Sequence, residues 1–310
     1  MSTLLTFPGQ GAQHADMLHD LPQDALVRQT LEEATDCLGL SLAEIDSAEA
    51  LRSTRGVQLS LLIAGVASAR LLAAAGCEPD MVLGLSIGAY PAAVVAGSLA
   101  FADALHLVRL RGDLMQQAYP SGYGMSAVIG LSLTQVEQIV AAQFLADSPI
   151  YVANINSPEQ VVVAGHEAGL ARVAEVAVRD YNARKVARIA ISVPSHCALL
   201  APQAEELGAA FASVELARPH CTYVSASFAR ALFVPEKIRD DLANNMARQV
   251  HWHDAATHAY ERGVRLAIET FPGGTLTGLC RSVFSSGGDA VAMSQNSLSN
   301  LATLHRRYAE

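Results

Sequence analysis

The sequence predicts an α/β protein with a mainly parallel sheet buried between helices and a smaller subdomain inserted into it. Hydrophobic residues make up 51% of the 310 residues and charged residues only 16%, a composition that suits a sheet covered on both faces. Short apolar runs alternate with stretches of helical period. The segment 124–192 departs from this alternation and has the order β-α-β-β-α-β. At this length ~75% of the unfolded surface can be buried, so folding needs no staple or partner.

Apolar runs and the residues that interrupt them define the first part of the chain. Leu4–Phe7 is expected to be a short strand because Pro8-Gly9-Gln10-Gly11 breaks the run. Apolar residues at helical spacing predict amphipathic helices, and the second of these ends at Gly76. The expected elements are a strand at 4–7, helices at 24–37 and 57–75, a strand at 81–85, and helices at 87–96 and 103–118.

The segment 124–192 is expected to form a ferredoxin-like subdomain, which divides the chain into a core of 1–123 and 193–310 and this insertion. Its first helix is expected to begin at a capping box of Thr134 and Glu137. The expected elements are strand 125–130, helix 134–144, strands 150–155 and 160–164, helix 167–180 and strand 186–191. The core then continues with helix 198–212, strand 222–225, helices 235–246 and 253–262, strand 264–270 and a helix starting near 275.

One stretch tests the globular interpretation, because the 22 residues from Met81 to Ala102 carry no formal charge. That length could span a bilayer. The run nevertheless contains four glycines or prolines, is bounded by Asp80 and Asp103, and lacks flanking Lys or Arg. We therefore expect a buried strand, a turn and a packed helix instead of a membrane span.

Charge and cysteine content exclude several classes of protein. The net charge of −9 without a basic block argues against nucleic acid and anionic membranes as main partners. The five cysteines are scattered with no CxxC pair, which indicates reduced thiols in a cytoplasmic protein and no zinc site. The N-terminus lacks the basic and apolar regions of a signal peptide.

A candidate nucleophile lies at the end of the expected strand 81–85. Gly84-Leu85-Ser86-Ile87-Gly88 matches G-x-S-x-G, and it follows a strand and opens a helix, as that motif requires. The glycines permit a sharp turn that exposes the serine hydroxyl, and N–H groups at the helix start favour an oxyanion. The context is typical of an α/β-hydrolase-like core. The alternative is an ordinary strand–helix turn with a capping serine.

A serine nucleophile needs a base, and the best-placed candidate is His196. It follows the inserted subdomain at a strand-to-helix junction, where a loop residue can reach the site. His251 and His253 flank the only tryptophan and compete for the role. No acidic residue between Ser86 and His196 stands at an evident strand end, so a dyad is expected in place of a triad.

These motifs resemble those of the malonyl-CoA:acyl carrier protein transacylase family over almost the whole chain. Phe7–Gln13 resembles the family's FPGQGSQ, Gly84–Tyr90 its GHSxGEY elbow, and Val193–Cys197 its VPSHC motif. Arg111-Gly112, the segment from Asn156 to His166 and Gly274–Leu279 are similar to further family motifs. Each motif alone is weak to moderate, but together they occur in family order and spacing.

The resemblance implies a role for each of these residues. Ser86 would be the nucleophile, His196 the base and Arg111 the clamp on the malonyl carboxylate, with backbone N–H groups of Gln10 and Ile87 as the oxyanion hole. It implies malonyl-CoA as substrate, an acyl carrier protein as partner and no bound cofactor or metal. The alternative that Gly9-Gln10-Gly11 is a nucleotide loop is weak, because the glycine register fails at His14.

Helical periodicity gives independent support for Arg111. On the helix 103–118 it falls at the centre of the apolar stripe, whereas Arg109 points almost the opposite way. A buried guanidinium needs a partner or a substrate, and a carboxylate fits it bidentately. An acetyl group would leave it unpaired, which could reject acetyl by ~10⁴-fold.

Three departures from the family pattern bear on the acyl donor and the carrier. Leu85 and Ala89 replace the histidine and glutamate of the elbow, and His251 replaces a glutamine. His251 is a candidate for orienting the base or lining the pocket. The elbow most resembles the epsilon (transacylase) subunit of malonate decarboxylase, whose carrier bears phosphoribosyl-dephospho-CoA and which acts with other decarboxylase subunits. The alternative is the transacylase of fatty-acid or polyketide synthesis.

Two further hypotheses and one docking surface complete the expectations. A serine thioesterase or esterase lacks support because the triad acid and an HGGG-type loop are missing. A non-catalytic carrier-binding subunit is disfavoured by the joint presence of serine, histidine and arginine. Carrier docking, or contact with a cofactor phosphate, is expected at a basic cluster consisting of Arg179, Arg184, Lys185 and Arg188, with a solvated helix end as the alternative.

Overall fold

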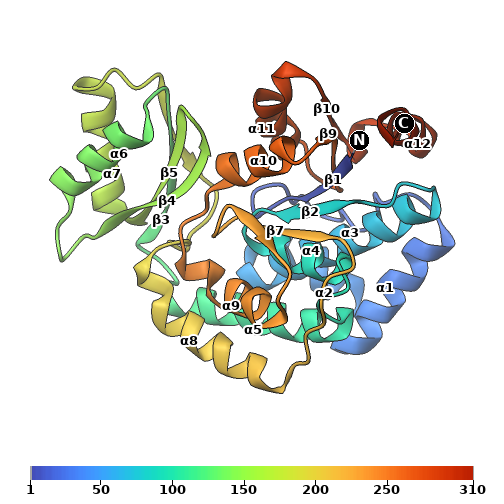
Figure 1. The fold of residues 1–310 in the computed structure, drawn as a ribbon. Helices are drawn as coiled ribbons and strands as arrows, with labels where there is room; N and C mark the ends of the chain where they lie inside the picture. Colours follow the sequence, from blue (N-terminus) through green and yellow to red (C-terminus); the bar gives the residue numbers. More distant parts are fainter. Residues whose placement is uncertain (1, 310) are drawn as a thin grey trace.

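The computed structural model describes residues 2–309 and places their strands in two sheets (Figure 1). The larger sheet has six strands in the order β10-β9-β1-β2-β7-β8, all parallel except β8, which is antiparallel to β7. Its strands are β1 (Ser2–Phe7), β2 (Met81–Gly84), β7 (Thr222–Ser225), β8 (Arg230–Leu232), β9 (Val264–Glu269) and β10 (Asp289–Ala292). The predicted fold class is confirmed. Strands β8 and β10 are additional, and both are too short to show a period in the sequence.

Helices cover both faces of the large sheet, because its central strands bury alternate residues on opposite sides. On β1, Leu5 and Phe7 join the core beneath the sheet, whereas Leu4 joins the core on the other side, against α10 and α11 (Figure 1). The helices of this part are α1 (Ala25–Leu38), α2 (Leu42–Asp46), α3 (Thr54–Ala74), α4 (Ala89–Val95), α5 (Phe101–Ala118), α8 (Ala201–Ala210), α9 (Pro235–Asn244), α10 (Trp252–Glu261), α11 (Thr275–Val283) and α12 (Leu298–Ala309). This layering is what a near-continuous apolar β1 and β2 require.

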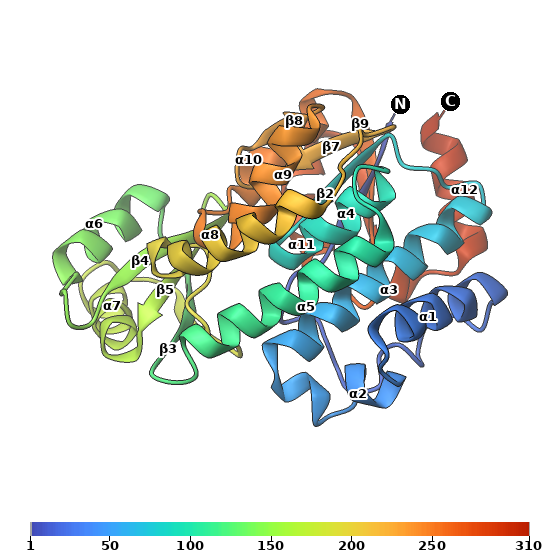
Figure 2. The same cartoon turned by 90° about the horizontal axis from the view of Figure 1, so that it is seen from below.

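The uncharged run 81–102 is not one helix. It divides into β2, a short 3₁₀ turn η2 (Ser86–Gly88) and the seven-residue α4, so the rejection of a membrane span there is confirmed. A different helix, α3, is long and apolar enough to cross a membrane, but 83% of its most apolar window is buried inside the protein. It packs against α1, α4 and α5 (Figure 2), and this packing accounts for its composition.

The smaller sheet forms the predicted subdomain, with strand order β4-β5-β3-β6 and every pair antiparallel. Its elements are β3 (Tyr123–Ile129), α6 (Leu133–Gln143), β4 (Ile150–Ser157), β5 (Gln160–His166), α7 (Glu167–Arg179) and β6 (Lys185–Ile189). This is the ferredoxin-like order. Both helices pack on one face of the sheet, and the other face turns Met125, Ala127 and Val162 toward the core (Figure 1).

The predicted capping box of α6 was wrong by two residues. Ser132 caps this helix, and its hydroxyl accepts from the backbone N–H of Gln135 while the Gln135 side chain accepts from the Ser132 N–H. The helix begins at Leu133, so Thr134 lies inside its first turn. The sequence contains two pairs with the spacing of a capping box, Ser132 with Gln135 and Thr134 with Glu137. The structure forms the first pair.

The subdomain is joined to the core by more than its two covalent links. The N–H of Ile155 on β4 donates to the carbonyl of Val250 (2.7 Å), and the N–H of Val250 donates to the carbonyl of Ala153 (2.9 Å). Val250 thereby continues the edge of the small sheet as a parallel bridge. The segment just before α10 therefore belongs to both parts of the molecule.

Candidate active site

The strand-to-helix turn after β2 holds Ser86 in a strained conformation. Its φ is +57°, a left-handed value that costs a residue with a side chain about 1–3 kcal/mol. A Cβ on Gly84 would overlap the backbone of Gly88, and one on Gly88 would overlap the carbonyl of Phe7. The two glycines of the motif therefore allow the turn to close and let the end of β1 pack directly against it. Ser86 is half-buried and lines a cleft.

The loop after β1 reaches the same place. The N–H of Leu85 donates to the carbonyl of Phe7 at 3.0 Å, and parallel pairing of β1 with β2 brings both carboxyl ends to one sheet edge. Gln10 and its neighbours Gly9 and Gly11 line the cleft beside Ser86. The structure thus places the two predicted oxyanion-hole residues, Gln10 and Ile87, on the two segments that meet at the nucleophile.

His196 is the base candidate that the structure brings to Ser86. Its Nε2 lies 2.8 Å from Ser86 Oγ, and its ring is buried. Its Nδ1 lies 2.7 Å from the carbonyl oxygen of Asn245 and 3.2 Å from that of Arg248. Because carbonyls only accept hydrogen bonds, Nδ1 carries the proton and Nε2 is left to accept from the serine hydroxyl.

The environment also keeps this imidazole uncharged. Burial, and then the positive charge of Arg111, lower the pKa of His196 to about 4, against the two carbonyl hydrogen bonds that raise it. At neutral pH the ring is therefore in the form that can take a proton. The backbone of His196 is also left-handed, with a φ of +64°. Both Ser86 and His196 are therefore held in strained backbone conformations.

Arg111 lies on α5, which runs between α3 and α8 (Figure 2). It is fully buried, as its position in the apolar stripe predicted, whereas Arg109 is partly exposed. Its Nη2 lies 3.1 Å from Asn245 Oδ1 and 3.4 Å from Ser86 Oγ. Within residues 2–309 its Nε and Nη1 have no hydrogen-bond partner. Burial lowers the pKa of Arg111 to about 10, so the group is still charged at neutral pH.

Asn245 connects these groups and was missed by the sequence analysis. Its backbone carbonyl accepts from the His196 ring, its Oδ1 accepts from Arg111, and its Nδ2 donates to the carbonyl of Ser86 at 3.2 Å. It forms part of the short 3₁₀ turn η5 (Asn245–Ala247) after α9. Asparagine is common at helix ends, so the position carried no distinct signal in the sequence.

The cleft in front of Ser86 has a volume of about 260 Å³ and lies between the core and the small sheet. Core residues of the β1 loop and the elbow form one wall. Met125, Ala127 and Val162 of the small sheet form the other. None of the cleft residues belongs to the group Asp16, His19 and Asp46, which is the one cluster of potential metal ligands found in the described part of the chain.

Two sets of predicted residues do not join the dyad. His251 makes no hydrogen bond to His196 among the described residues, since main-chain carbonyls already occupy Nδ1, and it is absent from the cleft lining. The arginines of the basic cluster are each paired locally. The pairs are Arg179 with Glu175 and Asp180, Arg184 with Glu159, and Arg188 with Glu167. Lys185 is exposed. The cluster is therefore less cationic than its sequence indicated.

The chain is similar to known proteins over almost its whole length. Residues 5–306 match the family model described as acyl transferase domain. The malonyl CoA-acyl carrier protein transacylase of Haemophilus influenzae is 36% identical over 305 residues, which cover 96% of each chain. The structure of the corresponding transacylase from Coxiella burnetii superposes with a TM-score of 0.92 at 31% identity, covering 100% of this chain and 98% of that one.

A second similar structure contains a partner. It is a complex of a type II PKS acyl-carrier protein with its malonyl-transacylase, and the matched chain has a TM-score of 0.90 and 33% identity. The match covers 99% of this chain and 100% of that one. These similarities extend over both sheets and over the segments that carry the dyad.

Proposed function

The chain belongs to the malonyl-CoA:acyl carrier protein transacylase family, and we propose that it transfers a malonyl group from malonyl-CoA to the thiol of an acyl carrier protein. The observation that carries this proposal is the buried guanidinium of Arg111, which is charged, has two unpaired nitrogens and lies 3.4 Å from the nucleophile. The free carboxylate of a malonyl group would supply the missing acceptor, and a guanidinium binds it bidentately.

In the first half-reaction, His196 Nε2 takes the proton of Ser86 Oγ as that oxygen attacks the thioester carbonyl. The oxyanion that forms is stabilised by the N–H groups of Gln10 and Ile87. When the intermediate collapses, the carbon–sulfur bond breaks and the CoA sulfur leaves with the proton from His196. Malonyl-Ser86 remains.

The second half-reaction reverses this sequence with the carrier thiol. His196 takes the thiol proton, the sulfur attacks the malonyl ester, and Ser86 leaves with that proton. Every group that acts belongs to the chain, so we propose no cofactor and no metal. The five free cysteines support a reducing, cytoplasmic setting.

The test is to mix the protein with malonyl-CoA, without a carrier, and to measure the mass of the Ser86 peptide. We expect a malonyl adduct in the wild type and none in Ser86→Ala. Addition of a carrier should discharge the adduct onto the carrier thiol. The absence of an adduct in the wild type would contradict the proposal, and release of free malonate faster than transfer would favour a thioesterase instead.

The identity of the carrier separates two versions of this function. The relatives described above are named transacylases of acyl carrier protein, and one similar structure holds a type II PKS acyl-carrier protein. These names support the version in which the carrier is that of fatty-acid or polyketide synthesis. The departures at Leu85 and Ala89 favour the malonate decarboxylase version. Leu85 lines the cleft and packs beside Gly9, and Ala89 is buried at the start of α4, so the surroundings of Ser86 are apolar where the family has histidine and glutamate.

A comparison of two acceptors decides between them. One is a carrier bearing phosphopantetheine, and the other is a carrier bearing phosphoribosyl-dephospho-CoA. We expect transfer to the first, and exclusive use of the second would assign the protein to a decarboxylase complex. The transfer assay must be run at equal concentrations of the two carriers.

For carrier docking we propose Arg184 and Lys185. The ion pair of Arg184 with Glu159 is largely exposed, and such pairs stabilise a protein by only about 0–1 kcal/mol. An acidic carrier could therefore replace Glu159 at little cost. Reversal of both charges should raise the KM for the carrier and leave the KM for malonyl-CoA unchanged.

A further inference from the structure

We infer that the ion pair between Asp240 and Arg248 is a positioning element for His196, because it fixes the main-chain carbonyls that hold the imidazole. The inference rests on the proposed function in taking His196 as the base. Neither residue touches the substrate cleft, and both act through the backbone of the turn between α9 and α10.

Three carbonyls of this turn bind His196. Those of Asn245 and Arg248 lie 2.7 and 3.2 Å from its Nδ1, and that of Met246 accepts its backbone N–H at 2.7 Å. We call residues 245–248 the carbonyl cradle. Inside the cradle the Arg248 N–H donates to the carbonyl of Asn245 at 3.3 Å. A single weak internal bond does not define a turn sharply, so its shape depends on outside contacts.

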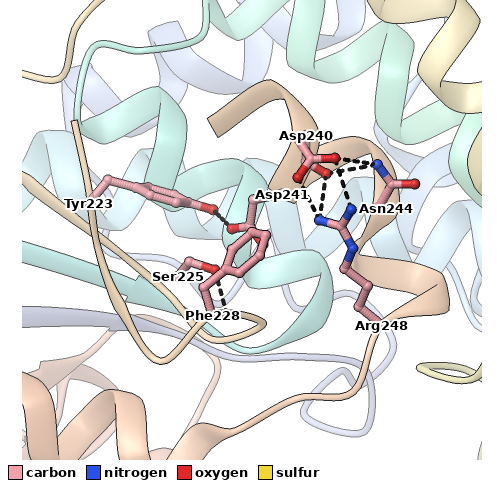
Figure 3. Close-up of polar contacts among 7 residues, drawn as sticks. All are labelled: Tyr223, Ser225, Phe228, Asp240, Asp241, Asn244 and Arg248. Atoms are coloured by element: carbon pink, nitrogen blue, oxygen red, sulfur yellow. Dashed lines mark hydrogen bonds and ion pairs between the residues drawn. The ribbon is translucent and has the colours of Figure 1, made fainter. Parts of the chain in front are cut away.

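The side chain of Arg248 supplies such a contact. Its Nη1 and Nη2 each lie 2.8 Å from one carboxylate oxygen of Asp240, and its guanidinium stacks over the ring of Phe228 at 5.2 Å (Figure 3). Asn244 Nδ2 also donates to Asp240 Oδ1 at 2.9 Å. A bidentate ion pair fixes the orientation of the guanidinium as well as its distance from the carboxylate. The last residue of the cradle is thereby tied back onto α9.

Helix α9 is in turn anchored to the large sheet. The next residue, Asp241, is buried and accepts a hydrogen bond from the hydroxyl of Tyr223 on β7 at 2.8 Å (Figure 3). A continuous chain of contacts therefore leads from β7 through Asp241 and Asp240 to Arg248, and from its carbonyl to His196. These contacts end at Nδ1 of His196, which is the atom that the aspartate of a serine–histidine–aspartate triad would contact.

The pair contributes little to stability by itself, which makes its role separable from folding. The two side chains are 34% and 39% exposed, and ion pairs at such positions stabilise by about 0–1 kcal/mol. A shift of Arg248 would act differently, because its N–H donates to the carbonyl of Asn245 and its own carbonyl faces Nδ1, so both acceptors that fix the tautomer would move. An imidazole with its proton on Nε2 cannot accept from Ser86.

The test uses Asp240→Asn, which removes the charge and one of the two acceptors. The matched control is Glu33→Gln. Glu33 pairs with Arg70 at 2.6 Å with 40% and 33% exposure, and Arg70 also stacks over a phenylalanine, Phe101, at 5.2 Å. Two readouts are needed. Nitrogen-15 NMR of the imidazole, assigned by loss of the signal in His196→Gln, gives the tautomer. The rate of Ser86 malonylation gives the chemistry.

We expect wild type and Glu33→Gln to hold His196 as the Nδ1–H form alone and to acylate at rates within twofold of each other. Asp240→Asn should show a mixture of tautomers and a malonylation rate at least tenfold lower at unchanged KM for malonyl-CoA. Asp240→Glu, which keeps the carboxylate, should restore most of the rate. If Asp240→Asn does not fold, Arg248→Lys is the test variant, because it keeps a positive charge but cannot form the paired contacts of Nη1 and Nη2 with Asp240.

A single tautomer and an unchanged rate in Asp240→Asn would overturn the inference. An equal loss in Glu33→Gln would also overturn it, since that result would indicate a general effect of losing an ion pair. Failure of the wild type to form malonyl-Ser86 would contradict the proposed function, but the tautomer measurement would still test the positioning role.

Discussion

The Nδ1 atom of His196 lies 2.7 Å from the carbonyl oxygen of Asn245. A main-chain oxygen thus takes the place that an aspartate has in a serine–histidine–aspartate triad. A carbonyl fixes the tautomer as an aspartate does, but it adds no negative charge next to the imidazole. Burial and the charge of Arg111 therefore lower the pKa of the ring, and the hydrogen bonds to the two carbonyls offset this only in part.

The first prediction concerns the pH dependence of malonylation. Since the pKa of His196 is lowered to about 4, the acylation rate should be constant through neutral pH and should fall only as the pH drops toward 4. A single-turnover measurement of malonyl-Ser86 formation between pH 4 and 8 checks this. An acid limb centred near 6.5, the ordinary histidine value, would contradict a buried, neutral base.

The same pKa predicts how stability varies with pH. The folded state binds a proton on His196 less tightly than the unfolded state does. The contribution of this histidine to the free energy of unfolding is therefore complete above about pH 6.5 and is lost as the pH falls to about 4. The loss amounts to about 3 kcal/mol. The free energy of unfolding of wild type should therefore decrease more steeply between pH 6.5 and 4 than that of His196→Asn. Equal slopes would be inconsistent with the lowered pKa.

A third prediction addresses the choice of acyl group. Arg111→Met removes a buried charge and keeps most of the volume, so the protein should remain folded or gain stability. The preference for malonyl-CoA over acetyl-CoA in kcat/KM should fall by at least ~10²-fold, since each charge-assisted hydrogen bond stabilises by about 1.5–3 kcal/mol. A preference that survives this substitution would show that another group recognises the carboxylate.

Asn245→Asp tests the link between Arg111 and the dyad. It puts a carboxylate 3.1 Å from the guanidinium, where it would compete with the malonyl carboxylate for the same charge. We expect the KM for malonyl-CoA to rise about tenfold, in line with one charged hydrogen bond. Steady-state kinetics at saturating carrier measures this. An unchanged KM would indicate that malonyl binds elsewhere.

The last prediction concerns the close contact between the elbow and β1. Gly88→Ala would place a methyl group against the carbonyl of Phe7, which should lower the unfolding temperature and abolish malonylation. Gly278→Ala on α11 is the matched control, because a Cβ there meets no atom within 4 Å. Replacing a helical glycine by alanine should raise the free energy of unfolding by about 0.4–1 kcal/mol. Equal effects of the two would contradict the packing argument.

Local patterns in the sequence predicted the parts of the fold and site that depend on neighbouring residues. The apolar strands, the G-x-S-x-G turn and the buried Arg111 on an apolar helix face are all of this kind, and the structure has each of them. What the sequence did not reveal arises from main-chain atoms or distant pairs. The carbonyls that hold His196 have no side-chain signature, and α9 ends between Asp240 and Arg248, so no single periodic element relates the two residues.

The basic cluster shows a different limit. Counting charges along one segment indicated a cationic surface, but the carboxylates that compensate Arg184 and Arg188 come from other elements. Glu159 lies in the turn between β4 and β5, and Glu167 lies at the start of α7. Strand pairing brings these carboxylates next to Arg184 and Arg188, and a linear reading cannot foresee that.

The hydrogen bonds of Val250 with both Ala153 and Ile155 also limit how this protein can be recombined with its relatives. The small sheet supplies one wall of the cleft, so exchanging it between family members is an attractive route to altered donor choice. A graft cut only at the ends of the insertion would leave β4 facing a foreign version of the segment that follows Arg248. The unit to exchange is therefore discontinuous and has to include residues 248–251 along with the subdomain.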